Sequence, residues 1–431
     1  MARLALPVAV SQVGQLTMGL VDTWMVGGLG AAALGAVSMG DSLYFTFAVV
    51  AFGVVMAVEP LVSQAHGAGD PERARAAWAA GRLVGLALSV PLLLVAVFAP
   101  WVLSVLGLEP EVARLGGLYV QSRAVGSTLM LLFAADRSFL NGLGHTRPAM
   151  IAMILANLIN LPLTWGLVYG RLGLPALGVA GAGWATTGST IVTWFVLWRW
   201  ARRVGGGGPA DPTAARALVG RTLRLGIPLG LGHGSEVGAF ALAALFMGWL
   251  GTVPLAAHQV AIKMAATSFM LAVAISTATA IRVGHAVGAR RPADAARSGR
   301  VGVILGWVVM GASGLLFALL GREIAASFTD DPGVIELGAA LLVVAAAFQL
   351  SDGSQVILAG ALRGAVDTIW PFWANLIAYY GVALPLAWGL VFQLGYGPTA
   401  VWWALALGLT GAALIMGLRF RSVVHRAVPL R

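Results

Sequence analysis

Twelve long apolar stretches run along the 431-residue chain, separated by short segments rich in glycine, proline and arginine. A stretch of about 20 apolar residues can cross the hydrocarbon core of a membrane as a helix. The pattern therefore predicts twelve membrane-spanning helices and no sizeable water-soluble domain. Their expected positions are residues 6–28, 34–62, 80–103, 115–140, 149–170, 177–200, 223–249, 255–282, 300–320, 335–361, 371–392 and 398–420.

The composition agrees with a chain that lies mostly in a membrane. It is 59% apolar and only 10% charged, whereas soluble globular domains average about 25% charged residues. A soluble enzyme, a disordered tail and a disulfide scaffold are thereby excluded. The chain also has no cysteine, which removes thiolate nucleophiles and cysteine-ligated metals.

The distribution of arginine predicts how the chain is oriented. A net charge of +10 would favour a nucleic acid partner in a soluble protein, but cytoplasmic loops of membrane proteins are themselves enriched in Lys and Arg. With a cytoplasmic N-terminus, most of the 27 basic residues fall in inner segments, chiefly 73–82, 137–147, 199–224, 282–300 and 419–431. We therefore expect a multi-pass protein of the cytoplasmic (inner) membrane, with both termini cytoplasmic, contacts to membrane lipid and no nucleic acid partner.

The two halves of the chain resemble each other. Leu161–Val168 and Leu384–Val391 are identical at seven of eight positions, and Pro7 has a counterpart in Pro228 at nearly the same offset. Six helices per half make the repeat parallel, which is typical of transporters that rock one bundle against the other. The predicted domains are an N-lobe over 1–201 (helices 1–6), a cytoplasmic linker over 202–221 and a C-lobe over 222–431 (helices 7–12).

Ionisable groups inside the apolar stretches mark candidate sites, since each costs roughly 2.5–3.5 kcal/mol at the centre of a membrane helix. The strongest candidates are Asp22, Glu236 and Asp352. By its spacing, Asp22 shares one helix face with Gln12 and Gln15, and this face is expected to line an aqueous cavity. Glu236 and Asp352 lie at similar depths, so they are expected to face one cavity and to hold a proton or share a cation. Either behaviour suits an ion-coupled transporter.

Other side chains leave alternatives open. Lys263, the only lysine, either pairs with Glu236 or extends to the outer interface. Asp41 lies near a helix end, where a solvated or capped carboxylate is expected. Trp24, Tyr44 and Phe348 are weaker candidates for the cavity, because aromatic faces near carboxylates attract lipophilic cations.

Common enzyme motifs are missing from the sequence. It has no HExxH zinc motif, no GxSxG nucleophile elbow and no GxxxxGK[ST] nucleotide loop. We therefore expect no enzymatic activity and no resident cofactor, with H⁺ or Na⁺ as the coupling ion that supplies the energy.

Four short motifs carry a family resemblance. They are Val21–Gly27 (VDTWMVG), Ala256–Val260 (AAHQV), Arg282–His285 (RVGH) and Gly360–Gly364 (GALRG). The chain resembles the multidrug and toxic compound extrusion (MATE) family over nearly its whole length, in its NorM-like branch. The resemblance implies a V-shaped pair of six-helix lobes that exports organic cations in exchange for Na⁺ or H⁺. It implies that Asp22, Glu236 and Asp352 are the coupling acids, and that Asn160 and Gln259 are polar cavity positions.

Three positions depart from the family pattern. Thr164 stands where another branch has an aspartate, Phe348 stands where some sodium-using relatives have a tyrosine beside the acid of helix 10, and Lys263 replaces a neutral polar residue. The lysine could substitute for a metal ion beside Glu236. The resemblance therefore leaves open whether Na⁺ binds at one of the three acids or whether protons alone are exchanged.

Two transport functions follow from these observations. The first is an antiporter that exports small cationic amphipathic drugs by alternating access, acting as a monomer. The alternative is a flippase for a lipid-linked or polysaccharide precursor, which would favour an arginine-rich cavity to hold phosphates. An intramembrane hydrolase that uses Glu236 and Asp352 is a third, weaker hypothesis. The excess of acidic groups within the spans favours the antiporter.

Overall fold

A computed structural model describes residues 1–206, 208 and 211–425, and every regular element in this part of the chain is a helix. The predicted all-α polytopic fold class is confirmed. The elements are α1 (Ala2–Gly27), α2 (Ala31–Val55), α3 (Val58–Gly67), α4 (Pro71–Val105), α5 (Pro110–Ala124), α6 (Ser127–Gly142), α7 (Arg147–Tyr169), α8 (Val179–Val204), α9 (Pro212–Leu250), α10 (Thr252–Gly288), α11 (Pro292–Ala326), α12 (Pro332–Gly364), α13 (Ile369–Leu376), the π-helix η1 (Ile377–Ala383), α14 (Leu384–Trp388), the π-helix η2 (Gly389–Gln393) and α15 (Thr399–His425).

Ten of the described helical stretches are long and apolar enough to cross a membrane, and α5 with α6, bent by 46° at a short break, makes an eleventh. The chain is therefore a multi-pass membrane protein. The one predicted span that remains, residues 177–200, is present as the 26-residue helix α8. That helix is long enough to span, at about 1.5 Å per residue. It falls short in hydropathy because it carries Thr186, Thr187 and Thr193 together with two arginines in its last turn.

The described residues form two compact units, and their boundaries fall inside helices. The N-terminal unit covers Val10–Gly230, and the C-terminal unit covers Met1–Ala9 together with the chain from Leu231 onward. Met1–Ala9 belong to the C-terminal unit because Ala5 packs with Ile275, Ala278 and Ile357 in one apolar cluster. Each unit holds five of the twelve predicted helical stretches whole, and the stretches 6–28 and 223–249 are divided between the two units.

The predicted linker over 202–221 is helical at both of its ends. Arg202–Val204 finish α8, and Pro212–Arg221 begin α9. Three residues of its glycine-rich middle, Gly207, Pro209 and Ala210, lie outside the described residues, as does the C-terminal segment 426–431 with its two arginines.

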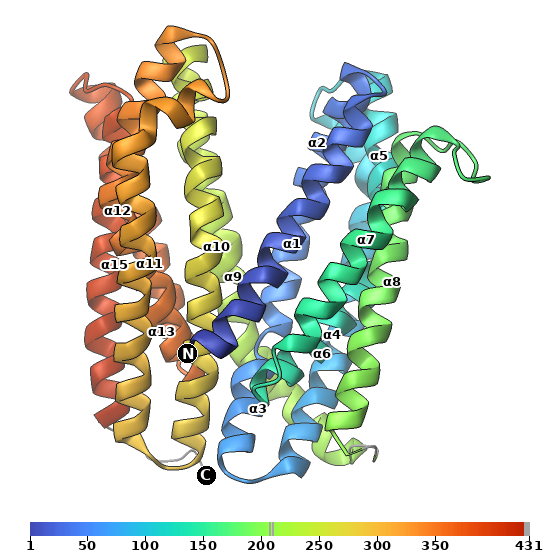
Figure 1. The fold of residues 1–431 in the computed structure, drawn as a ribbon, viewed down its shortest axis with the longest axis vertical. Coiled ribbons are helices and arrows are strands. Elements are labelled where there is room, and N and C mark those ends of the chain that lie inside the picture. The colour runs from blue at the N-terminus through green and yellow to red at the C-terminus, as the bar shows by residue number, and fades with distance from the viewer. Residues whose placement is uncertain (207, 209–210, 426–431) are drawn as a thin grey trace. The chain divides into compact units, whose positions relative to one another are not determined.

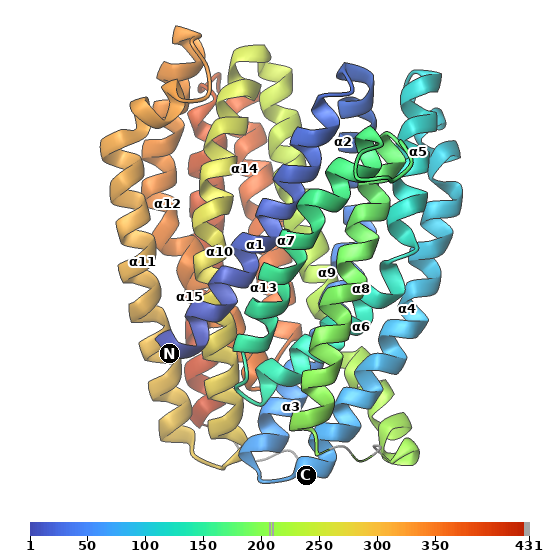
Figure 2. The same cartoon turned by 45° about the vertical axis from the view of Figure 1, so that its right-hand side comes forward.

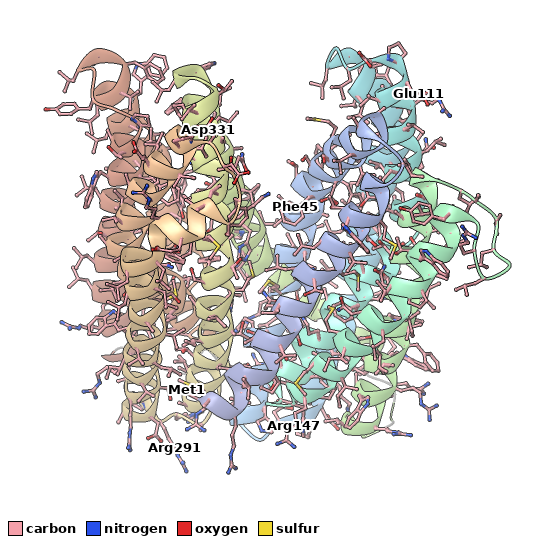
Figure 3. All side chains as sticks on the ribbon, turned by 45° about the horizontal axis from the view of Figure 1, so that its top comes forward. Met1, Phe45, Glu111, Arg147, Arg291 and Asp331 are labelled. Carbon is pink, nitrogen blue, oxygen red and sulfur yellow. The ribbon has the colours of Figure 1, made fainter. Side chains whose placement is uncertain are left out.

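In the N-terminal unit the core forms where α2, α4, α5, α6 and α8 meet, as Figure 2 shows for the last four. Buried residues from these helices, such as Val37, Leu92, Val120 and Leu131, share one apolar cluster. Glu111 and Arg147 lie at opposite ends of this unit (Figure 3).

Gly181 determines how closely α7 and α8 approach. A methyl group at this position would lie 2.4 Å from the Leu167 carbonyl oxygen, which is backbone and cannot rotate away. We expect Gly181→Ala to lower the free energy of unfolding by about 1–3 kcal/mol, the usual cost of overpacking. Thermal unfolding of the purified protein measures this. Gly411→Ala is the control, since nothing lies within 4 Å of the added methyl, and its melting temperature should be equal or higher. An equal loss in both variants would contradict this account.

In the C-terminal unit, α11, α12 and α15 lie side by side (Figure 1). Buried side chains of α9, α10, α12 and α15 form its largest apolar cluster. The predicted helix over 371–392 differs from the structure, because η1 and η2 interrupt it with wider turns. π-Helical turns are rare and frequently occur at functional sites. Asp331 and Arg291 lie at opposite ends of this unit, and Met1 lies toward the Arg291 end (Figure 3).

Candidate functional site

The three predicted acids fall at two sites, one in each unit. In the C-terminal unit, Glu236 of α9 and Asp352 of α12 are close enough for their charges to interact. The Tyr379 hydroxyl of η1 faces Glu236. Asp352 is 4% exposed and Tyr379 is 1% exposed. Neither carboxylate forms an ion pair with any residue that the structure describes.

Two glutamines flank Asp352 on its helix, three residues before and three after it. Gln349 Nε2 donates to Ser268 Oγ of α10 at 2.6 Å, and Gln355 Nε2 donates to Asn375 Oδ1 of α13 at 2.7 Å. With the amide nitrogens engaged, the Oε1 atom of each glutamine is buried without a hydrogen bond. Carboxylate and amide oxygens are the ligands that hard cations prefer. Residues 211–425 therefore supply two carboxylates close to each other, and two unpaired amide oxygens on the helix of Asp352.

Tyr379 is a site residue that the sequence did not reveal as one. The resemblance linked the tyrosine of sodium-using relatives to Phe348, but Phe348 is 2% exposed and packs in the apolar core, 6.0 Å from the ring of Trp402. A different element, η1, brings Tyr379 to Glu236. Its neighbour Tyr380 donates to the Ser235 carbonyl at 3.0 Å, so the two tyrosines attach η1 to α9. The only signal in the sequence is a tyrosine pair in an otherwise apolar helix.

In the N-terminal unit, hydroxyl groups hold Asp22. Thr164 Oγ1 of α7 donates to its Oδ1 at 3.0 Å, and Thr186 Oγ1 of α8 donates to its Oδ2 at 2.7 Å. The buried amide of Asn160 also faces this carboxylate. Asp22 is 5% exposed and forms no ion pair in the described chain. Thr164, which marks a departure from a related branch, thus supplies a hydroxyl in place of a second acid.

The polar face predicted for α1 does not share one environment. Gln15 and Gly19 are exposed, whereas Asp22 is buried against α7 and α8. A helical spacing places residues on one side of their own helix, but neighbouring helices decide which of them are covered. Trp24 is 73% exposed and Tyr44 is 2% exposed, so these two aromatic candidates also lie in different environments.

On α10, Gln259 and Lys263 are exposed and lie four residues apart, on one helix face. Lys263 forms no ion pair with an acid among residues 211–425 or elsewhere in the described chain. Of the two alternatives for this lysine, pairing with Glu236 is therefore not observed.

Two other acids in the spans are paired with arginines. Asp136 of α6 is fully buried and accepts from Arg82 Nη1 and from Trp78 Nε1, both at 2.7 Å. Asp41, expected to be solvated or capped, is instead paired with Arg123 of α5. These pairs separate acids that a cation of the chain neutralises from Asp22, Glu236 and Asp352, which lack such a cation.

Comparisons with known proteins agree with two related halves of the chain. A family model described as MatE matches the chain twice, over residues 7–166 and 228–388, so the two matches begin at the repeated Pro7 and Pro228. The probable multidrug resistance protein NorM of Bradyrhizobium diazoefficiens is 35% identical over 99% of the chain and 93% of its own length. The multidrug resistance protein PmpM of Pseudomonas aeruginosa is 35% identical over 99% of the chain and 91% of its own length.

Solved structures share the fold. The crystal structure of the eukaryotic MATE transporter AtDTX14 superimposes with a TM-score of 0.88 at 21% identity, covering 99% of this chain and 97% of that one. A MATE crystallised in complex with MaL6 gives a TM-score of 0.90 at 20% identity, with 99% and 96% coverage.

Proposed function

The chain belongs to the MATE family, and on that premise we propose that it is an antiporter that exports lipophilic organic cations in exchange for H⁺ or Na⁺. Two relatives with 35% identity are multidrug resistance proteins by name, which supports drugs as substrates. The proposal includes no catalytic activity and no resident cofactor. A monomer is sufficient, because each unit contains its own acid site.

One observation carries the proposal: Asp22, Glu236 and Asp352 are acids within the spans that lack a cation of the chain as partner. A carboxylate is costly in a membrane unless its charge is neutralised. A proton or Na⁺ can neutralise it, and so can an organic cation. Since one carboxylate cannot serve two cations fully, binding of the ion weakens binding of the substrate. Linkage makes this effect reciprocal, which is the thermodynamic requirement for exchange.

The site of the C-terminal unit suits either coupling ion. Glu236 and Asp352 can share a proton, because two carboxylates close together resist ionising at the same time. The unpaired oxygens of Gln349, Gln355 and Tyr379 would instead complete a shell for Na⁺. At the site of the N-terminal unit, Thr164 and Thr186 direct hydroxyl donors at Asp22, which stabilise its ionised form when it has released a proton.

We place both termini in the cytoplasm and the protein in the cytoplasmic membrane. In the C-terminal unit, Met1 and the end of α15 lie toward the turn that carries Arg291 (Figures 1 and 3). In the N-terminal unit, the basic end carries Arg147. Arginine-rich ends of membrane helices face the cytoplasm, so the opposite ends, with Glu111 and Asp331, face outward.

Transport by purified protein in liposomes tests this function directly. The substrate in this assay is tetraphenylphosphonium. We impose a proton or Na⁺ gradient that drives the ion in the direction opposite to export. We expect this gradient to drive tetraphenylphosphonium against its own concentration gradient. The two gradients are imposed separately, so the productive one identifies the coupling ion. Liposomes without protein are the control. Movement of tetraphenylphosphonium that ignores both gradients would refute the antiporter.

A further inference from the structure

Arg123, at the end of α5, is enclosed by one carboxylate and two tyrosines of the N-terminal unit. Its Nη1 donates to Asp41 Oδ1 of α2 and, at 2.7 Å, to Tyr119 Oη. Its guanidinium carbon lies 5.1 Å from the ring centre of Tyr44 and 5.9 Å from that of Tyr119. We call Asp41, Tyr44 and Tyr119 the tyrosine cage. An acid combined with aromatic faces is the chemistry that binds organic cations, and here the cation is a side chain of the protein.

Several contacts fix the cage in place. Tyr44 and Tyr119 are both 2% exposed, and the Tyr44 hydroxyl is hydrogen-bonded to Ser127 Oγ of α6 at 2.8 Å. Thr187 Oγ1 of α8 donates to the Ser122 carbonyl at 2.9 Å, which satisfies a backbone acceptor freed by the break between α5 and α6. Asp41 differs from the tyrosines, since its side chain is 46% exposed. Neighbouring helices therefore cover the aromatic walls of the cage, and its carboxylate is open to solvent.

The cage is also electrostatically linked to the buried acid of this unit. Arg123 lies within electrostatic range of Asp22, and Thr186, which bonds Asp22, immediately precedes the Thr187 that holds the end of α5. The ionisable groups that face Arg123 are Asp41 and Tyr44 from α2, Tyr119 from its own helix and Asp22 from α1. In the described structure, α6 and α8 contribute only hydroxyl groups. One guanidinium thus pairs with an exposed carboxylate and lies within electrostatic range of a buried one.

A purely structural ion pair in the same unit looks different. Asp136 is fully buried under Arg82, and the Trp78 indole provides a second donor to the same oxygen. No other cation could reach that carboxylate without opening the bundle. Asp41 is accessible and its partner has a second acid nearby, so its pairing can be exchanged.

We propose that the tyrosine cage binds organic monocations, that the substrate displaces the Arg123 guanidinium from Asp41, and that the displaced guanidinium moves to Asp22. This inference rests on the proposed function and gives it a mechanism in the N-terminal unit. Before binding, Asp22 carries a proton and Arg123 neutralises Asp41, so the net charge of the three groups is zero. After binding, the substrate neutralises Asp41 and Arg123 neutralises Asp22, which has released its proton. One proton leaves for each monocation bound, and the net charge of the three groups together with the substrate is again zero.

The physical reason for this exchange is the cost of an unpaired charge away from water. A buried carboxylate or guanidinium without a counter-charge is strongly unfavourable, so Arg123 cannot leave Asp41 unless another acid receives it. Protonation of Asp22 removes that acid, which returns Arg123 to the cage and expels the substrate. The tethered guanidinium thereby makes occupancy by proton and by substrate mutually exclusive at two separate carboxylates.

Counting the protons released per bound tetraphenylphosphonium tests the inference. Calorimetric titrations of the purified full chain in two buffers of different ionisation enthalpy give this number. All variants in this test are made in a parent protein that carries Glu236→Gln and Asp352→Asn. These two substitutions remove the ionisable carboxyl groups of the site in the C-terminal unit. We expect about one proton per bound cation in the parent, as the charge balance requires. In Arg123→Gln we expect binding of equal or higher affinity with almost no proton release. Arg123→Lys keeps the charge and should keep the release.

Two further variants complete the test. Asp41→Asn should weaken binding of tetraphenylphosphonium at least tenfold, because the cage loses its charge. Arg114→Gln removes another arginine of α5, which pairs with the exposed Glu111, and should leave both affinity and proton release at the parent values. Proton release that is unchanged in Arg123→Gln, or affinity that is unchanged in Asp41→Asn, would overturn the cage. In that case, gradient-driven exchange in liposomes would still support the antiporter. If the liposomes show no gradient-driven exchange, the proposed function itself is overturned.

Discussion

Neutralising either acid of the C-terminal unit, by Asp352→Asn or Glu236→Gln, is expected to lower the rate of tetraphenylphosphonium export at least about 30-fold, while the protein still folds. Removing one desolvated charge from its cationic partner costs about 2–5 kcal/mol, and about 1.4 kcal/mol corresponds to a factor of ten in rate. Folding should survive because neither carboxylate forms an ion pair with a described residue. Initial rates in liposomes and the melting temperature measure the two effects.

Asp367→Asn is the matched control for this experiment. Asp367 is also an acid of the C-terminal unit, but Arg419 Nε binds it at 2.7 Å and neutralises it permanently. Its substitution should lower the melting temperature and leave the coupling of ion to substrate unchanged. Full export by both Asp352→Asn and Glu236→Gln would show that these acids hold no transported cation, and the antiporter would lose the observation that carries it.

The second large effect is expected at the hydroxyl groups around Asp22. Thr186→Val removes the 2.7 Å hydrogen bond to Asp22 Oδ2 and keeps the volume of the side chain. A hydrogen bond to a charged group contributes about 1.5–3 kcal/mol, so proton-coupled export should fall by about 10-fold or more. Asp22→Asn should remove the coupling of this unit entirely. The pH dependence of the initial export rate measures both, since loss of a proton site flattens it.

Thr193→Val on the same helix separates this role from simple packing. Thr193 is buried, but its hydroxyl donates only to carbonyl groups of its own helix. The Thr193→Val variant should therefore export tetraphenylphosphonium at the rate of the unsubstituted protein. Equal losses in Thr193→Val and Thr186→Val would mean that α8 tolerates no valine at these positions, and the assignment of Thr186 to Asp22 would fail.

The candidate acids could be chosen from the sequence because their cost is a property of the apolar stretch around them. Asp22, Glu236 and Asp352 stand out as soon as the spans are drawn, and the repeat that begins at Pro7 and Pro228 assigns them to two halves. Their partners could not be chosen this way. Thr186 and Tyr379 lie 164 and 143 residues from Asp22 and Glu236 in the chain, and only helix packing brings them together.

Hydrophobic length and the internal repeat determined an all-helical membrane protein of two related halves, because burial of apolar residues in lipid depends on local composition. The tertiary structure decided which acids are neutralised by the chain itself. Asp136, Asp41 and Asp352 all lie in apolar stretches, yet the first two pair with an arginine, and Asp352 forms no ion pair with a described residue. Spacing along a helix fixes which side a residue occupies, but the charge it meets there comes from another helix, and that pairing depends on how the bundle packs.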